Sequence, residues 1–452
     1  MNSRNPATGE ILREYDEHDD TLEERLDKAN DCFQDWRGQS VSDRRQLVRK
    51  LADILRENKS RYSELMTAEM GKPIEQARAE VEKCAWGCEF YAEHAAEFLQ
   101  DRHVGTVPNA KTYVANEPLG PILAVMPWNF PFWQVFRFAA PALAAGNTAV
   151  LKHSSNVPGC ALAIEEVFAE AGFPEGCFTT LLVDSNTVSE IVMDNRIAAV
   201  TLTGSEYAGK AVAETAGKHL KKCVLELGGS DPYIVLDDAD IADAAATGAQ
   251  ARNQNSGQSC IAAKRFIVDE DVYDEFIDEF TEQVESLEVG DPTNESTDIG
   301  PQASRSLLKE LHNQVEASVN AGATVVTGGE PLQREGAFYP PTILTDIPDE
   351  CPARDEELFG PIAAVFKVSD ETAAIDLAND TRYGLGASVW TADRARGEQL
   401  ARNIDAGCVF VNEMVKSDPR MPFGGIKDSG YGRELSKDGM LEFVNRKTVW
   451  IE

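Results

Sequence analysis

The sequence predicts an α/β protein built around two open, mainly parallel β-sheets. The chain has 452 residues, 42% of them hydrophobic, and short apolar runs alternate with helical stretches from about residue 120 onward. A chain of this length and composition can bury two substantial cores and a third small element. Strands that alternate with helices are typical of parallel sheets, because the crossover helices cover the faces of the sheet.

Residues 21–100 are predicted to form a helical layer. Leu47, Leu51, Ile54 and Leu55 recur with helical spacing, and residues 83–99 continue the pattern. The runs expected as strands of the first sheet are 122–126, 148–151 and 198–202. Those expected as strands of the second sheet are 233–236, 265–268, 324–327 and 363–366. The two series predict two domains that resemble nucleotide-binding folds.

Acidic residues dominate the charge balance, with 76 against 43 basic residues and a formal net charge of −33. Such a surface repels nucleic acid and anionic membranes, so neither is an expected partner. The acidic residues are spread over runs such as 16–20, 237–240 and 269–271. Their mutual repulsion is screened near 1 M salt, where the Debye length falls to about 3 Å. A halophilic origin is therefore the hypothesis, and full stability at low salt would contradict it.

Targeting segments, disulfides and metal sites are not expected from the sequence. No run approaches the roughly 18 to 20 uncharged apolar residues of a spanning helix, and residues 1–6 do not begin a signal peptide. The nine cysteines form no C-x-x-C unit and the six histidines form no H-E-x-x-H pair. We therefore expect a cytoplasmic protein without a structural metal.

Four motifs carry the chemistry. Cys260 lies in the run Asn-Ser-Gly-Gln-Ser-Cys-Ile-Ala, and Glu226 precedes it by about one βα unit in Leu-Glu-Leu-Gly-Gly. Pro-Trp-Asn-Phe-Pro occupies 127–131, and Glu-Leu-Phe-Gly-Pro occupies 357–361. A thiol nucleophile and a carboxylate base are thus both available. With these motifs in this order, the chain resembles the NAD(P)-dependent aldehyde dehydrogenase superfamily over essentially its whole length.

The resemblance implies a division of the chain into three parts. Residues 1–100 and 120–229 would form the dinucleotide-binding domain, and residues 230–425 the catalytic domain. Residues 101–119 and 426–452 would form a bridging element that joins subunits into a homodimer or homotetramer.

The predicted cofactor loop follows the strand at 200–203. Gly204 and Ser205 open a helix there, so a pyrophosphate could sit against free backbone amides at the helix N-terminus. Neither generic nucleotide motif is satisfied, because G-x-G-x-x-G is absent and Ala211 replaces the Ser or Thr of a P-loop. The resemblance assigns cofactor binding to Trp128, Lys152, Ser154, Ser155, Gly204, Ser205, Leu227, Glu357 and Phe359.

Ser155 is the expected selector between the two nicotinamide cofactors. An acidic residue at this position would bind both ribose hydroxyls and repel a 2′-phosphate. Ser155 is neutral and stands beside the cationic Lys152. We therefore expect use of NADP, or of both NADP and NAD, with strict use of NAD as the alternative.

The resemblance also implies the reaction. Cys260 would attack the aldehyde carbon, and the oxyanion would be stabilised by the Asn129 side-chain amide and the Cys260 backbone N–H. After hydride transfer, Glu226 would activate the water that hydrolyses the thioester. Enzymes that pass the acyl group to coenzyme A need no such base, so Glu226 favours a carboxylic acid product.

Arg137 and Ser417 are the candidate substrate residues. An Arg on the helix after Asn129 can clamp a carboxylate, and with Ser417 it resembles the succinate-semialdehyde dehydrogenase branch of the family. Alternatively, Arg137 forms a structural salt bridge, and Phe132, Trp133 and Phe136 line an apolar tunnel for a broad range of aldehydes. The alternative from a different functional class is a non-catalytic oligomer that only binds the cofactor.

Overall fold

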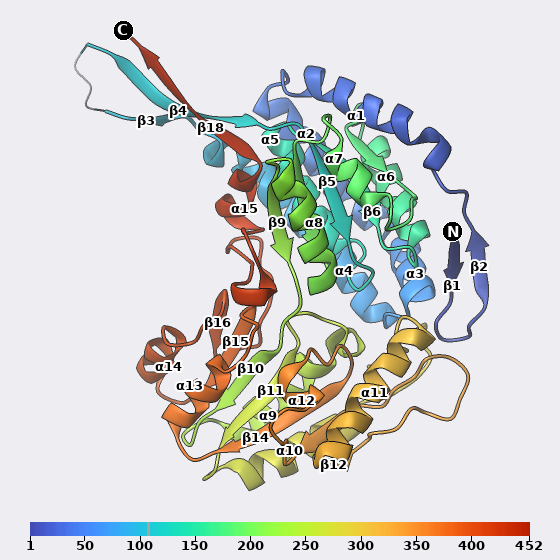
Figure 1. Ribbon diagram of the computed structural model, residues 1–452, viewed down its shortest axis with the longest axis vertical. Coiled ribbons are helices and arrows are strands. Elements are labelled where there is room, and N and C mark those ends of the chain that lie inside the picture. Colours follow the sequence, from blue (N-terminus) through green and yellow to red (C-terminus); the bar gives the residue numbers. More distant parts are fainter. Residues whose placement is uncertain (106–108) are drawn as a thin grey trace.

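The computed structural model describes residues 1–105 and 109–452, and it begins with a hairpin and a helical layer (Figure 1). The hairpin pairs β1 (Asn2–Arg4) with β2 (Ile11–Glu14). The helices that follow are α1 (Leu22–Trp36), α2 (Val41–Glu57), α3 (Lys59–Met70) and α4 (Ile74–Phe98). In α2, the buried residues Val48, Leu51, Ala52 and Leu55 share one face, which explains why this segment packs as a helix on the rest of the layer.

The first sheet has six strands in the order β17-β9-β8-β5-β6-β7. Its strands are β5 (Pro121–Met126), β6 (Thr148–His153), β7 (Phe178–Thr180), β8 (Ala199–Thr203), β9 (Lys222–Glu226) and β17 (Gly430–Tyr431). Its helices are α5 (Trp133–Ala145), α6 (Pro158–Glu170), α7 (Val188–Met193) and α8 (Glu206–Lys218). All but β17 are parallel, and β8 is buried along its whole length, as expected for a strand covered on both faces.

The second sheet has seven strands in the order β12-β13-β14-β11-β10-β15-β16. They are β10 (Asp231–Val235), β11 (Ala263–Asp269), β12 (Thr324–Thr327), β13 (Thr342–Thr345), β14 (Ile362–Val368), β15 (Gly386–Trp390) and β16 (Cys408–Val411). Its helices are α9 (Ile241–Asn253), α10 (Tyr273–Glu285), α11 (Arg305–Ala321), α12 (Pro352–Asp355), α13 (Glu371–Asn379) and α14 (Arg394–Ala401).

The predicted fold class is confirmed, with one difference in strand direction. The run 324–327 was expected among the parallel strands, but β12 pairs antiparallel with β13 at the edge of the sheet. Val325 and Val326 are 38% and 40% exposed, so this strand does not have the two buried faces of a central parallel strand. Both large sheets therefore carry one antiparallel edge strand, β12 in one and β17 in the other.

A three-stranded antiparallel arm projects away from both sheets and carries the C-terminus (Figure 1). It consists of β3 (Arg102–His103), β4 (Lys111–Pro118) and β18 (Val444–Ile451), in the order β18-β4-β3. Helix α15 (Ser436–Glu442) contacts α5, and β17 pairs with β9, so residues 426–452 contribute both to the arm and to the first sheet.

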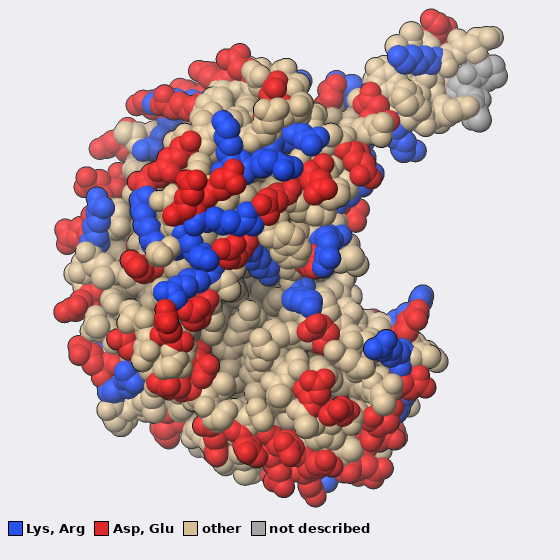
Figure 2. Space-filling view, turned by 180° about the vertical axis from the view of Figure 1, so that it is seen from behind, with Lys and Arg blue, Asp and Glu red and all other residues tan. Residues whose placement is uncertain are grey.

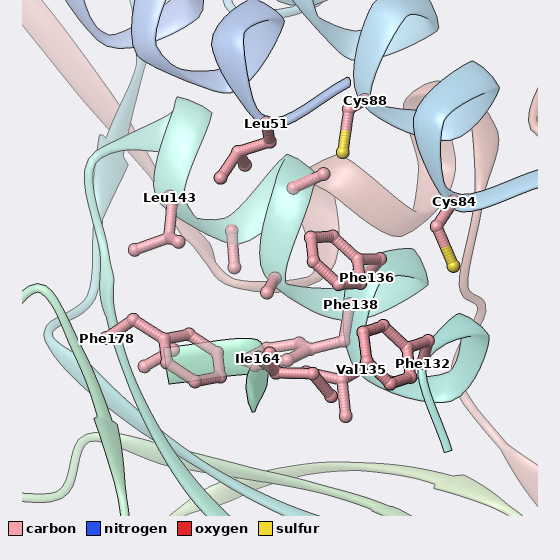
Figure 3. Packing of buried hydrophobic residues seen from close by; sticks show 14 of the residues in the cluster. Leu51, Cys84, Cys88, Phe132, Val135, Phe136, Phe138, Leu143, Ile164 and Phe178 are labelled. Carbon is pink, nitrogen blue, oxygen red and sulfur yellow. The ribbon is translucent and has the colours of Figure 1, made fainter. Parts of the chain in front are cut away.

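Helix α5 is the central element of the first core. Its residues Val135, Phe136 and Phe138 pack with Leu51 of α2 and with Cys84 and Cys88 of α4 (Figure 3). The N-terminus of α5 is held by the buried Glu80, whose carboxylate accepts hydrogen bonds from the backbone N–H groups of Phe132 and Trp133, both at 2.9 Å. Lys72 forms a buried ion pair with the same carboxylate. Glu80 thus fixes where the chain enters α5.

The arm is tied to the first sheet by the buried Asn147. Its Oδ1 accepts from Leu119 N at 2.8 Å and from Gly120 N at 3.2 Å, and its Nδ2 donates to Phe443 O at 3.0 Å. One side chain therefore joins the connection between β4 and β5 to the residue that precedes β18.

Replacing this side chain should destabilise the junction. We expect Asn147→Ala to lower the free energy of unfolding by about 2–4 kcal/mol, because it leaves buried backbone groups without partners. Urea denaturation followed by tryptophan fluorescence measures the effect as a lower midpoint. Asn294→Ala, at an exposed position, is the matched control and should change stability by less than about 0.5 kcal/mol. Equal midpoints for the two variants would contradict the assignment.

Candidate active site

A cavity with a volume of about 690 Å³ lies where the two sheets meet. Trp128 and Asn129 follow β5, Gly204 and Ser205 follow β8, and Leu227 follows β9; all five line the cavity. In the sheet, β6 lies on one side of β5 and β8 on the other, so the strand order reverses next to β5. The cavity lies at this point, at the carboxyl ends of the strands. This is the usual ligand position in an open α/β sheet. We call this space the first cavity.

The second sheet contributes the opposite wall of the first cavity, including Cys260, Glu357 and Phe359. The rings of Trp128 and Phe359 meet edge to face across it, with centroids 5.8 Å apart. Of the predicted catalytic and cofactor residues, the structure brings Trp128, Asn129, Gly204, Ser205, Leu227, Cys260, Glu357 and Phe359 onto this one surface.

The start of α8 forms one end of the first cavity. Ser205 caps this helix, since its hydroxyl accepts from Ala208 N at 3.3 Å. The remaining free N–H groups and the helix dipole suit a pyrophosphate. A Cβ on Gly228 would lie 2.5 Å from Glu357 Oε2, so a side chain at this position would displace the Glu357 carboxylate. These features fit a dinucleotide whose nicotinamide ribose is bound near Glu357.

Lys152, Ser154 and Ser155 lie at the end of β6, the neighbour of β5, and they do not line the first cavity. Ser155 is exposed, whereas Lys152 is only 8% exposed. Burial lowers the pKa of Lys152, and the nearby carboxylate of Asp184 opposes this effect. These three residues therefore lie at the carboxyl end of the strand next to β5, outside the first cavity.

The loop that carries Cys260 is held by backbone contacts from several side chains. Lys264 Nζ donates to Cys260 O at 2.8 Å and to Ser259 O at 3.0 Å. The same ammonium lies 3.4 Å from Glu357 Oε1. Asn129 Nδ2 donates to Gln258 O at 3.1 Å. Because an amide carries two hydrogens, Asn129 retains one for an oxyanion.

The thiol of Cys260 is neutral in this state. Burial raises the pKa of Cys260 to about 12, while the positive charges of Arg137 and Lys264 lower it. The thiolate, not the thiol, is the nucleophile. Reaction therefore requires that a base or a bound ligand promote loss of the Sγ proton.

Glu226 ends β9 and is 2% exposed. Among the residues that the structure describes, neither of its carboxyl oxygens has a hydrogen-bond partner. Burial raises the pKa of Glu226 well above its ordinary value, the nearby Glu434 raises it further, and Arg137 lowers it. A carboxyl group in this state is a strong base once it has lost its proton.

Arg137 is 3% exposed and its guanidinium is occupied by protein groups. Its Nε forms an ion pair with Glu434, its Nη2 lies 3.4 Å from Thr203 Oγ1, and its guanidinium carbon lies 5.0 Å from the ring centroid of Phe423. Arg137 does not line the first cavity. The salt bridge that the sequence left open as an alternative is therefore present, with Glu434 as the partner.

A second cavity, of about 560 Å³, lies between α4, α5, α9 and the end of α10. Phe130 and Trp133 line it, whereas the preceding Asn129 lines the first cavity, so the two cavities flank the same segment. Of the three aromatic residues considered for an apolar tunnel, only Trp133 borders this space. Phe132 and Phe136 are instead buried in the core around α5 (Figure 3).

Ser417 is buried, and its hydroxyl oxygen accepts two hydrogen bonds. Its Oγ accepts from Trp133 Nε1 at 3.0 Å and from Lys83 Nζ at 2.8 Å. Lys83 also lines the second cavity. The structure thus joins the predicted Ser417 to a cation that sequence reasoning did not consider.

Three charged residues of the site were missed from the sequence: Lys83, Lys264 and Glu434. A signal for Lys264 existed, because a charged residue inside the apolar strand of 263–269 must find buried partners. Lys83 and Glu434 acquire their partners only through contacts between distant segments. Among the described residues, no group of three or more His, Cys, Asp or Glu side chains could hold a metal ion.

Comparison with known proteins identifies the relatives of this chain. Residues 1–449 match the model of the aldehyde dehydrogenase family. A probable succinate-semialdehyde dehydrogenase [NADP(+)] of Synechocystis sp. is 54% identical over 448 residues, which cover 99% of this chain and 98% of the relative. A succinate-semialdehyde dehydrogenase [NADP(+)] of Mycobacterium avium is 49% identical, with 99% and 96% covered.

Solved structures show the same similarity. Succinic semialdehyde dehydrogenase from Streptococcus pyogenes, in complex with NADP+, superposes with a TM-score of 0.97 at 38% identity and covers 100% of this chain and 99% of that one. An NAD-dependent aldehyde dehydrogenase from Sinorhizobium meliloti has a TM-score of 0.96 at 31% identity, with 100% and 91% covered.

The raised pKa of Cys260 predicts how this thiol reacts in the cofactor-free protein. Its rate of alkylation by iodoacetamide should keep rising with pH beyond pH 9, because the thiolate fraction grows until the pH reaches the pKa of about 12. Lys264→Met should slow alkylation at a given pH by about threefold or more, because the variant loses a charge that lowers this pKa. Mass spectrometry of the peptide containing Cys260 gives the rate, and Lys367→Met, on the exposed side of β14, is the control. A plateau below pH 8 would contradict the neutral-thiol assignment.

Proposed function

The chain belongs to the aldehyde dehydrogenase family, and we propose that it oxidises succinate semialdehyde to succinate with NADP+ as the preferred hydride acceptor. The observation that carries the proposal is the 54% identity, over 99% of the chain, to a probable succinate-semialdehyde dehydrogenase that uses NADP+. The site supports it, because Cys260 and Asn129 share one cavity with a dinucleotide-binding helix N-terminus, and the buried Glu226 immediately precedes Leu227 of that cavity.

The catalytic roles follow from the surroundings of each group. Cys260 first loses its Sγ proton to solvent in the first cavity, and Sγ then forms a bond to the aldehyde carbon. The carbonyl oxygen that becomes negative is stabilised by the free Asn129 Nδ2 hydrogen and by the Cys260 N–H. The nicotinamide accepts the hydride when the cofactor is bound. Glu226 then takes a proton from the water that attacks the thioester carbon, and Cys260 leaves with the release of the carboxylic acid.

The proposed preference for NADP+ depends on position 155. Ser155 brings no negative charge to the end of β6, and Lys152 stands nearby as a cation. A ribose 2′-phosphate would meet attraction there rather than repulsion. Dual use of NAD+ remains the alternative, because a neutral serine does not exclude the ribose hydroxyl.

The division of labour between the parts of the chain is also a proposal. Residues 1–100 and 120–229 would hold the dinucleotide, residues 230–425 would carry Cys260, and residues 101–119 and 426–452 would join subunits into a homodimer or homotetramer. The arm supports the last assignment, because Trp450 and Ile451 of β18 are 55% and 48% exposed on a projecting sheet (Figure 1).

We place the protein in the cytoplasm, since all nine cysteines lie in the described residues and none is paired.

We further propose that the protein is adapted to high salt. Acidic side chains cover much of the visible face and are densest over the half that holds the second sheet (Figure 2). Repulsion among these carboxylates weakens as salt shortens the Debye length.

Among the described residues, no helix is long and apolar enough to cross a membrane.

A broad-specificity aldehyde dehydrogenase is the second candidate. Phe130 and Trp133 on the second cavity favour it, because these rings would also accept an apolar aldehyde. Acyl transfer to coenzyme A is disfavoured by Glu226, and a non-catalytic oligomer by the presence of both Cys260 and Glu226.

Steady-state kinetics test the proposed substrate and cofactor. We expect kcat/KM for succinate semialdehyde to exceed that for butyraldehyde by at least about tenfold, equivalent to about 1.4 kcal/mol, because only the first carries a carboxylate. NADP+ and NAD+ are compared in parallel, each at high and at low KCl, with lower activity expected at low KCl. Equal rates for the two aldehydes would make this a general aldehyde dehydrogenase, and full activity at low KCl would remove the proposed salt adaptation.

The role of Glu226 is tested separately. Glu226→Gln should lower kcat by about 10²- to 10⁴-fold, because the neutral amide cannot accept a proton from water. A rapid burst of about one NADPH per active site should remain in stopped-flow absorbance, since hydride transfer precedes hydrolysis. An unchanged kcat would exclude Glu226 as the base, and Glu442→Gln, outside both cavities, controls for the loss of a carboxylate.

A further inference from the structure

Lys83 is a cation in the wall of the second cavity. It lies on α4, three residues after Glu80, and reaches across to the loop that carries Ser417. Its Nζ lies 4.7 Å from the ring centroid of Trp133, which borders the same cavity. The ring, the serine hydroxyl and the helix therefore hold the ammonium in one position.

The carboxylates nearest to this ammonium are already used elsewhere. Glu80 pairs with Lys72 and with two backbone N–H groups, and Asp418 accepts from Arg420 Nε at 2.8 Å. Within the described residues, no carboxylate lies within ion-pair distance of Lys83 Nζ. A partly buried ammonium without an anion loses hydration and gains no charge partner in return. The site thus has the charge and the space for an anionic ligand group.

Arg137 cannot fill this role without giving up its own partner. Its guanidinium is in an ion pair with Glu434 and borders neither cavity. Breaking a buried ion pair costs several kcal/mol, because one charge is left uncompensated. By contrast, Lys83 already faces the open space of the second cavity.

We propose that Lys83, oriented by Ser417 and Trp133, binds the carboxylate of the substrate, and that Arg137 acts from behind it as a fixed charge. This inference rests on the proposed function, since it names the residue that recognises the acid end of succinate semialdehyde. In this arrangement the aldehyde enters through the second cavity and reaches Cys260 from the side opposite the dinucleotide. The carboxylate of the substrate replaces the missing anion, whereas an uncharged aldehyde leaves Lys83 unpaired.

The charges that face Lys83 make this recognition sensitive to pH. Burial and the charge of Arg137 on α5 lower the pKa of Lys83 to about 8, against the opposing effect of Cys84 and Glu80 on α4 and of Asp418 on the Ser417 loop. Lys83 is therefore charged below about pH 8 and neutral above it. Binding of a carboxylate should weaken as the pH rises through this value.

Lys83→Gln tests the inference directly. We expect kcat/KM for succinate semialdehyde to fall by about 10- to 100-fold, mainly through KM, because the charged contact is lost. The value for butyraldehyde should stay within about threefold of that of the unmodified enzyme. Lys416→Gln is the matched control, since this exposed lysine in the same loop lines neither cavity and its loss should not alter the ratio.

The pH profile provides a second readout that a purely structural lysine would not change. In the unmodified enzyme, the ratio of kcat/KM for succinate semialdehyde to that for butyraldehyde should fall as the pH rises through about 8. In Lys83→Gln this dependence should disappear, and in Lys83→Arg it should move to higher pH because the guanidinium stays charged.

The outcomes separate this inference from the proposed function. If the unmodified enzyme does not prefer succinate semialdehyde, the proposed function itself fails. If the preference exists but Lys83→Gln retains it, Lys83 is not the carboxylate-binding residue, and the proposed function still holds. An equal loss for both aldehydes in a variant with unchanged thermal unfolding would also overturn the inference, because it would show a general effect on the site.

Discussion

The contact on which the active site depends is that of the buried Lys264 ammonium with the loop of Cys260. Its Nζ donates to the carbonyls of Ser259 and Cys260 and lies 3.4 Å from the carboxylate of Glu357. One cation thus contacts both the backbone of the proposed nucleophile and the side chain predicted to hold the nicotinamide ribose. Lys264 also lowers the pKa of Cys260 against the effect of burial. The same ammonium therefore influences both where the Cys260 backbone lies and how readily its thiol loses a proton.

Burial of charge organises the other half of the site in the same way. Glu226, Glu434 and Arg137 are all buried, and burial raises the pKa of both carboxyl groups while Arg137 lowers it. The arginine keeps this region from accumulating negative charge when Glu226 loses its proton. This explains why Arg137, which was predicted to bind substrate, instead forms an ion pair with Glu434 and borders neither cavity.

The two cavities divide the remaining tasks, and Glu80 links them to the core. By holding the N-terminus of α5, Glu80 sets the direction of Trp133, while Lys83 follows one helical turn later on the same α4. The first cavity offers free helix N–H groups and carries Cys260; the second offers aromatic rings and one cation. The segment Asn129–Trp133 separates the two cavities, since Asn129 lines the first and Trp133 the second.

The sequence by itself determined the fold class and the two strand series, because these depend on local periodicity. Its motifs, by their resemblance to a known family, predicted the nucleophile, the base and the dinucleotide loop. Only the tertiary structure decided which charges meet. Arg137 and Glu434 are nearly three hundred positions apart and Lys83 and Ser417 are 334 apart, and no local pattern encodes such pairings. The edge strand β12 likewise took its antiparallel direction from its neighbour β13 and from its exposure. Interactions between distant buried charges are decided by packing, because the cost of leaving any one of them unpaired exceeds any local preference.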